Sequence, residues 1–159
     1  MRLIVASSKK IRGWLREVAA FSALLFRKIT GIRHDVPYLN QFGTTHGVRE
    51  ILDKKIRPST LFPAWSSYGA TCSDEFDNLS FESCGMTCLS MILLHAGIDN
   101  VGSIELFRRS LEHGCYRYLP NGEIKGLYHE PFVSFLSTFG LYGKAHQFVG
   151  PYFIAHELT

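Results

Sequence analysis

Apolar side chains recur at helical spacing in one segment near the middle of the chain. Its apolar positions three or four residues apart are Cys88, Leu89, Ile92, Leu93 and Ala96. This spacing predicts a helix over residues 84–96 with one face buried in the core. Ser83 suits the N-cap of such a helix and Gly97 the position beyond its last turn. We therefore expect Cys84 in the first turn and Cys88 buried one turn later.

The pattern downstream predicts two more helices and a hairpin. Apolar residues at helical spacing indicate a helix over residues 103–114 and another that accepts Pro131 in its first turn and ends at Gly140. Between them, Asn121-Gly122 predicts a turn that joins the β-prone runs 115–118 and 124–127.

The part upstream of the central helix has weaker signals. Residues 36–42 are typical of a short extended segment that ends in polar side chains, and residues 48–56 of one or two helical turns. Proline and glycine in residues 57–73 indicate an irregular connection.

The positive charge of the chain is concentrated at its N-terminus. Residues 1–35 contain eight Lys or Arg against two acidic residues, whereas the whole chain has a formal net charge of +3. Apolar residues from Ile11 to Ile29 form one stripe of a helical wheel, which predicts a basic amphipathic helix. Its uncharged run, residues 18–26, is shorter than the roughly 20 residues that a membrane-spanning helix needs. The helix could pack on the domain, lie on an anionic membrane or bind a partner.

The cysteine pattern argues against disulfides and zinc. The chain has four cysteines, Cys72, Cys84, Cys88 and Cys115, with no CxxC pair and no recognisable secretory signal. Such cysteines are typical of reduced thiols, which favours a reducing cytoplasm. No nucleic-acid-binding motif is evident either.

Cys84 is a candidate nucleophile because of its place at the start of a helix. The unpaired N–H groups and positive dipole end of a helix favour a thiolate, which is the reactive form of cysteine. Small buried cysteines at helix starts are also ordinary, so position alone leaves both readings open.

Two motifs in order resemble the family-39 cysteine peptidases. The motifs are Val36-Pro37-Tyr38-Leu39-Asn40-Gln41 and, further on, Ser83-Cys84-Gly85-Met86-Thr87-Cys88. This family contains the papain-like domains that remove double-glycine leaders from bacteriocins, and stand-alone relatives. The resemblance runs from about Val36 to the end of the chain, and it implies a papain-like α+β fold.

The resemblance assigns roles to two residues. It implies that Cys84 is the nucleophile and that Gln41 donates to the oxyanion hole, where a backbone N–H at the helix start is the second donor. The substrate would be a peptide or protein, and this chemistry requires no metal or organic cofactor.

The histidine and the Asp or Asn of the family's C-terminal half are not evident in this sequence. His95 would lie roughly 16 Å from Cys84 along the same helix, too far to take its proton. His146 and His156 come late enough but lack the expected apolar strand. We therefore expect a basic helical extension at residues 1–33 and a domain at residues 34–159 that is truncated at its C-terminus, with its sheet half incomplete.

Three functions stay open at this point. The chain is part of a cysteine peptidase that would be inactive without its His/Asp half, or a non-catalytic peptide-binding module of the same fold. Alternatively, it is a membrane-surface adaptor that acts through residues 1–33, with no role in nucleic-acid binding.

Overall fold

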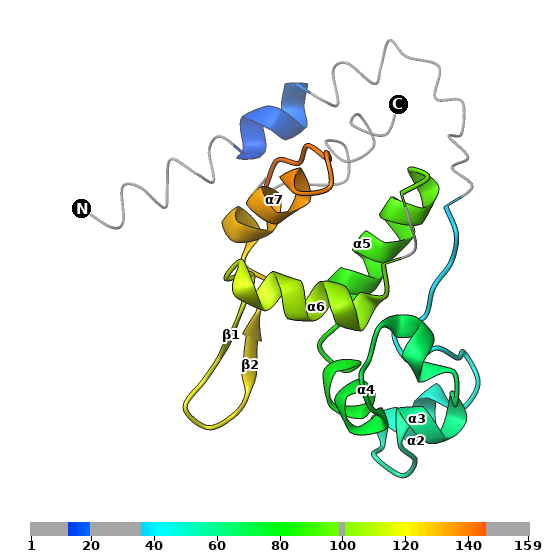
Figure 1. Cartoon of the computed structure of the whole chain (residues 1–159). Coiled ribbons are helices and arrows are strands. Elements are labelled where there is room, and N and C mark those ends of the chain that lie inside the picture. The colour runs from blue at the N-terminus through cyan, green and yellow to red at the C-terminus, as the bar shows by residue number, and fades with distance from the viewer. Residues whose placement is uncertain (1–12, 20–35, 99–100, 146–159) are drawn as a thin grey trace. The chain divides into compact units, whose positions relative to one another are not determined.

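The computed structural model describes residues 13–19, 36–98 and 101–145 (Figure 1). The chain divides into two compact units, Met1–His34 with Lys144–Thr159, and Asp35–Gly143. In the first unit residues 13–19 are helical, and their apolar side chains Trp14, Leu15 and Val18 are exposed. None of the helices in the described ranges has the length and apolar character to cross a membrane.

The unit Asp35–Gly143 has an α+β architecture with a helical majority. Its helices are α2 (Val48–Leu52), α3 (Pro58–Leu61), the 3-10 helix η1 (Trp65–Tyr68), α4 (Ser73–Leu79), α5 (Cys84–His95), α6 (Ser103–Glu112) and α7 (His129–Ser137). Strands β1 (Tyr116–Tyr118) and β2 (Ile124–Gly126) form one antiparallel pair, in which Arg117 lies opposite Lys125. Figure 1 shows α5 and α6 side by side, and the two helices are in contact.

The structure confirms the helices predicted near residues 84, 103 and 131 and the hairpin between them. The prediction of an irregular connection over residues 57–73 is wrong, because this stretch contains α3 and η1 and leads directly into α4. Local contacts explain the short helix α3. Pro58 occupies its first turn, and the buried Asp77 of α4 accepts hydrogen bonds from the Ser59 N–H and hydroxyl at 2.7 and 2.8 Å.

The buried face of α5 differs from the predicted one. Met86, Leu89 and Leu93 are fully buried, whereas Cys88 and Ile92 are exposed. Apolar residues occur almost all round this helix, so their spacing did not define one face. The buried face also includes two hydroxyls that backbone carbonyls satisfy. Thr87 donates to the Ser83 carbonyl at 3.0 Å, and Ser90 donates to the Val101 carbonyl at 2.8 Å.

The core joins α5 to α4, which precedes it, and to the elements that follow it. Besides the buried residues of α5, the largest buried side chains of this cluster are Phe76, Ile104, Leu106, Phe107, Tyr116 and Phe135. The rings of Phe107 and Tyr116 lie 4.4 Å apart between centroids, so β1 is packed against α6. This packing places the hairpin beside α6, which is itself in contact with α5.

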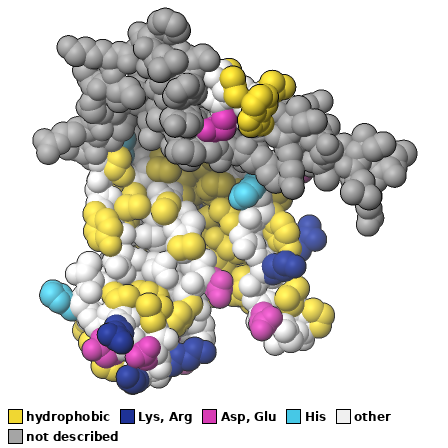
Figure 2. Space-filling view, turned by 180° about the vertical axis from the view of Figure 1, so that it is seen from behind, with side chains coloured by type: hydrophobic (Ala, Val, Ile, Leu, Met, Phe, Trp, Pro, Cys, Tyr) yellow, Lys and Arg dark blue, Asp and Glu magenta, His cyan; other side chains and the backbone are white. Residues whose placement is uncertain are grey.

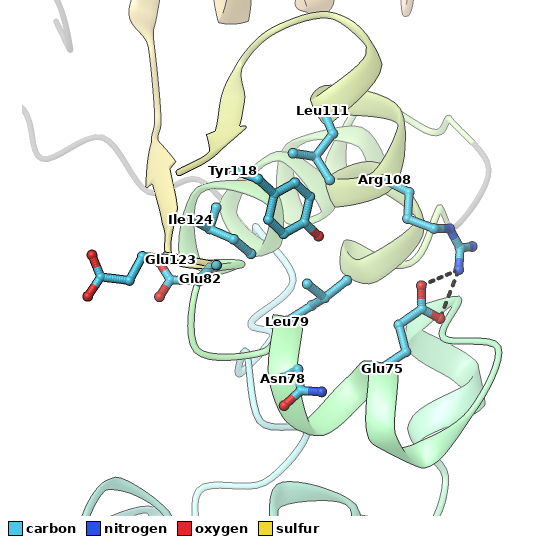
Figure 3. Close-up of a pocket in the computed structure, with 10 residues that line it drawn as sticks. Glu75, Asn78, Leu79, Glu82, Arg108, Leu111, Tyr118, Glu123 and Ile124 are labelled. Carbon is cyan, nitrogen blue, oxygen red and sulfur yellow. Dashed lines mark hydrogen bonds and ion pairs between the residues drawn. The ribbon is translucent and has the colours of Figure 1, made fainter. Parts of the chain in front are cut away.

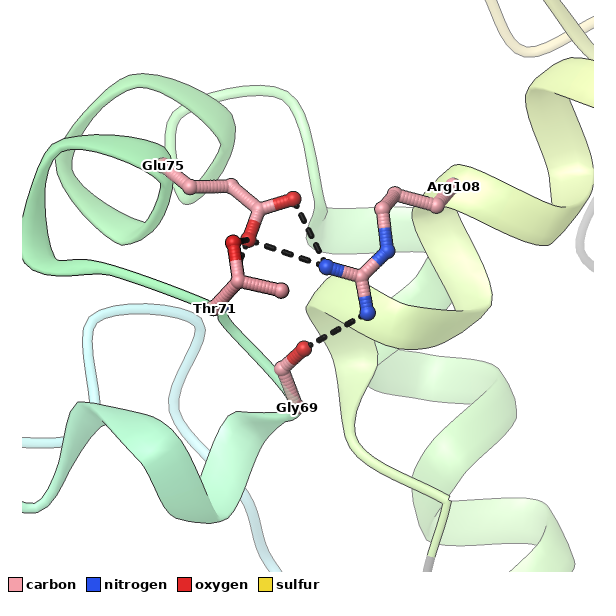
Figure 4. A network of polar contacts seen from close by, with 4 residues as sticks. All are labelled: Gly69, Thr71, Glu75 and Arg108. Carbon is pink, nitrogen blue, oxygen red and sulfur yellow. Dashed lines mark hydrogen bonds and ion pairs between the residues drawn. The ribbon is translucent and has the colours of Figure 1, made fainter.

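A polar network joins α4 to α6 (Figure 4). Arg108 Nη1 donates to both carboxylate oxygens of Glu75 at 2.8 and 2.9 Å, and Nη2 donates to the Gly69 carbonyl at 2.9 Å. Thr71 donates its N–H and its hydroxyl to the same carboxylate at 2.6 and 2.8 Å. Burial acts to raise the pKa of Glu75, but the hydrogen bonds from Thr71 and Arg108 outweigh it and lower the pKa below its ordinary value.

We expect this network to make stability depend on pH. Because the pKa of Glu75 is lower in the folded than in the unfolded chain, its contribution is present above the unfolded pKa and is lost as the pH falls through the folded pKa. Glu75→Gln should lower the free energy of unfolding at pH 7 by about 1–2 kcal/mol and should flatten its decline in acid. Urea unfolding between pH 7 and 3 measures both effects. The control is Glu105→Gln, because Glu105 is more exposed and lies 3.9 Å from Arg109. An equal loss in the two variants would contradict the assignment.

Candidate active site

Cys84 and Gln41 line one surface cavity of about 380 Å³, although they are far apart in the sequence. The other residues that line it are Tyr38, Leu39, Asn40, Phe42, Val48, Thr87, Cys88 and Met91. The cavity is therefore formed by the stretch 38–42, by Val48 at the start of α2 and by the first turns of α5. The structure brings together the two residues that the sequence analysis singled out.

Cys84 is the first residue of α5, and its side chain is exposed. Ser83 occupies the N-cap position as expected, but its buried hydroxyl donates to the Ser80 carbonyl at 3.1 Å and does not cap the helix. In the described part of the chain no side chain caps the start of α5, and its first turn contains no acidic residue. The positive end of the helix dipole at Cys84 is therefore available to an anion.

Gln41 lies in a tight turn and not at the end of a strand. The expected extended segment 36–42 forms no strand, and its last residues belong to this turn. Asn40 is a turn residue: its side-chain oxygen accepts from the Phe42 N–H at 2.9 Å, and its carbonyl accepts from the Gly43 N–H at 2.9 Å. Gly43 has φ +74°, and a Cβ there would lie 2.2 Å from the Phe62 ring, so only glycine fits.

Three contacts fix this turn to the rest of the unit. The buried Phe42 packs edge-on against Phe81, just before α5, with 5.2 Å between ring centroids. The Leu39 N–H donates to Met91 Sδ at 3.2 Å. The Tyr68 hydroxyl donates to the Asn40 carbonyl at 2.7 Å. Burial raises the pKa of Tyr68, so the hydroxyl keeps the proton that it donates.

The apolar spacing predicted that Cys88 is buried, and this prediction is wrong. Cys88 is exposed and lines the same cavity as Cys84, because α5 buries the face of Leu89 and Leu93 instead. Cys115 is the buried cysteine among the four, and burial raises the pKa of its thiol. Cys72 is exposed at the N-cap of α4, and it is absent from the cavity lining.

In the described part of the chain no histidine lines the cavity of Cys84. His95 is the last residue of α5, at the opposite end from Cys84. His113 packs against Phe135 with 5.0 Å between ring centroids. His146 and His156 lie outside the described residues. Over the described ranges, no group of three or more His, Cys, Asp or Glu is arranged to hold a metal ion.

A larger cavity of about 650 Å³ lies elsewhere on the unit (Figure 3). The Glu75–Arg108 pair lies at one end of it and Glu82 and Glu123 at the other, with Tyr118 between them. It shares no lining residue with the Cys84 cavity and contains no thiol. The surface view shows charged side chains of both signs gathered over one end of the unit, with no extended patch of one sign in this view (Figure 2).

Comparisons with models of protein families, with curated proteins and with solved structures gave no match.

Proposed function

We propose that this chain contains a cysteine peptidase domain of the papain-like type. The observation that supports the proposal best is that Cys84, at the uncapped start of α5, and Gln41, in a separate turn, line the same cavity. A nucleophilic thiolate needs a positive environment, and a tetrahedral intermediate needs hydrogen-bond donors beside it. The cavity contains a residue suited to each task.

The proposed reaction begins with attack of the Cys84 thiolate on a peptide carbonyl. The bond between carbon and sulfur forms while the carbonyl oxygen becomes an oxyanion, which the Gln41 amide and a backbone N–H of α5 stabilise. Collapse of the intermediate expels the amine, which must receive a proton, and water then releases the carboxylic acid from the acyl-enzyme.

A second candidate function is that of a peptide-binding module, which binds a peptide in the same cavity but does not hydrolyse it. The observation in its favour is that no histidine among the described residues lines the cavity to act as general base. Both functions place a peptide in the cavity, and they differ in the reactivity of Cys84.

We expect iodoacetamide to alkylate Cys84 faster than the other cysteines at neutral pH. Cys72 is a matched control because it is also exposed at a helix N-terminus, but the first turn of α4 contains Asp74 and Glu75 and that of α5 contains no acid. These carboxylates disfavour an anion at Cys72, so Cys84 should react about tenfold faster. Peptide mass spectrometry after short exposures between pH 5 and 8 measures each rate.

The buried Cys115 is the internal negative control, since it should react only on unfolding. Equal alkylation rates for Cys84 and Cys72 would contradict the proposal that Cys84 is an activated nucleophile and would favour the binding module.

A further inference from the structure

Three sulfur atoms border the candidate active site, and the peptidase chemistry uses one of them. Cys84, Cys88 and Met91 all line the cavity and occupy successive turns of α5. The thiols of Cys84 and Cys88 are free and exposed. Met91 Sδ faces the neighbouring segment, where it accepts the Leu39 N–H at 3.2 Å. A thioether sulfur has a second lone pair that this contact leaves open.

The spacing of the two cysteines suits a single metal ion. Residues four apart on a helix have Cβ atoms about 5–6 Å apart on the same face. Two sulfur atoms bound to one ion by bonds of about 2.3 Å lie about 4.6 Å apart when the two bonds are collinear, and closer together when the bonds are bent. Cys84 and Cys88 can therefore bind one ion from both sides without a change in the helix.

Met91 can supply a third sulfur to the same ion. Side chains on a helix lean toward its N-terminus, so a long residue covers the turn before its own. Met91 follows Cys88 by three residues, and its thioether therefore extends over the turn that contains Cys88. The contact with Leu39 fixes the sulfur at the border of the cavity.

The remaining lining residues decide which metal fits. They offer amide groups from Asn40 and Gln41 and hydroxyl groups from Tyr38 and Thr87, but no carboxylate or imidazole. Zn²⁺ prefers four N, S or O ligands, and Mg²⁺ and Ca²⁺ prefer oxygen, so these ions lack a complete ligand set here. A soft cation that binds two or three sulfur ligands has a complete ligand set here.

We propose that Cys84, Cys88 and Met91 form a binding site for a soft monovalent cation of the Cu(I) class. Each thiol loses its proton as its metal–sulfur bond forms, so two protons are released for each ion bound and no electron is transferred. The complex carries one net negative charge, which the positive end of the α5 dipole stabilises. Binding occupies the Cys84 sulfur and would therefore block any reaction at that thiol.

The test is an anaerobic titration of the full chain with Cu(I) in competition with a chromogenic chelator. We expect one ion per chain. Loss of an outer partner of a metal site costs 10–100-fold in affinity, so loss of a ligand by Cys84→Ser or Cys88→Ser should cost about 100-fold or more. Met91→Leu, which keeps the size of the side chain, should cost about tenfold. The matched control is Cys72→Ser, which removes an exposed thiol outside the cavity and should leave the affinity unchanged.

Circular dichroism and melting curves establish that each variant is folded. Wild-type affinity in Cys88→Ser or in Met91→Leu would overturn the three-sulfur site, as would an equal loss in Cys72→Ser. The result is independent of the proposed peptidase function, because Cu(I) binding needs neither Gln41 nor a general base. Alkylation rates of Cys84 in the metal-free protein test that function separately.

Discussion

Replacing Gly102 by alanine is expected to lower the free energy of unfolding by about 3 kcal/mol. A Cβ at this position would lie 2.1 Å from the carbonyl carbon of Tyr68, 2.3 Å from its oxygen and 2.6 Å from the Gly69 nitrogen. These atoms belong to the backbone and cannot rotate away as a side chain can. The backbone of Gly102 has φ −63° and ψ 146°, which any residue adopts, so the loss would be steric. Urea denaturation measures it.

Gly97→Ala is the matched control for this substitution. Gly97 has φ +71°, and a Cβ there would meet no atom within 4 Å. Its replacement therefore carries a conformational penalty of about 1 kcal/mol and no clash. If both variants lost the same stability, close packing at Gly102 would not be the cause.

The Gly102 substitution should also reach the candidate active site. Tyr68, whose backbone the new methyl group would displace, donates its hydroxyl to the Asn40 carbonyl, one residue before Gln41. A shift of η1 therefore moves the turn that contains Gln41. Stability and the geometry of the cavity are coupled here through a single close backbone contact.

The strongest local signals in the sequence predicted their elements correctly. The helices near residues 84, 103 and 131 have apolar spacing and suitable ends, and Asn121-Gly122 marks the hairpin. The short helix α3 was missed because its stability comes from Asp77, a residue of another helix, and not from its own pattern. The buried face of α5 could not be predicted, because the helix has apolar residues on almost all of its sides and tertiary contacts decide which side is buried.

In the candidate site too, local signals were readable in the sequence and tertiary contacts were not. The sequence indicated Cys84 by its position at a helix start and Gln41 by resemblance to a family motif. Of the contacts that bring them together, the sequence contained no signal for the packing of Phe42 on Phe81, and it contained one hint of the hydrogen bond from Tyr68. An aromatic residue in a polar loop, such as Tyr68, was the available hint.

Replacing Gln41 by alanine is expected to weaken the addition of a short peptide aldehyde to Cys84 by about 100-fold or more. The thiolate adds to the aldehyde carbon, and the carbonyl oxygen becomes an alkoxide that later takes a proton. Before it takes that proton, the alkoxide has the charge and the shape of the intermediate in peptide hydrolysis, so its formation needs the proposed Gln41 donor. The reaction requires no leaving group and no water, and it therefore tests the oxyanion donor separately from the rest of the catalytic cycle. Competition of the aldehyde with a fluorescent thiol label measures the affinity.

Alkylation by iodoacetamide is the control reaction for this prediction. Iodoacetamide reacts with Cys84 by displacement of iodide at a saturated carbon, and no oxyanion forms. Gln41→Ala should therefore leave the alkylation rate unchanged while the aldehyde affinity falls. The control is Asn78→Ala, which removes an exposed amide from the other cavity and should alter neither reaction. If Gln41→Ala lowered the aldehyde affinity and the alkylation rate by the same factor, Gln41 would hold the thiol in position and would not stabilise the oxyanion. If it changed neither quantity, the shared cavity of Gln41 and Cys84 would have no part in carbonyl chemistry.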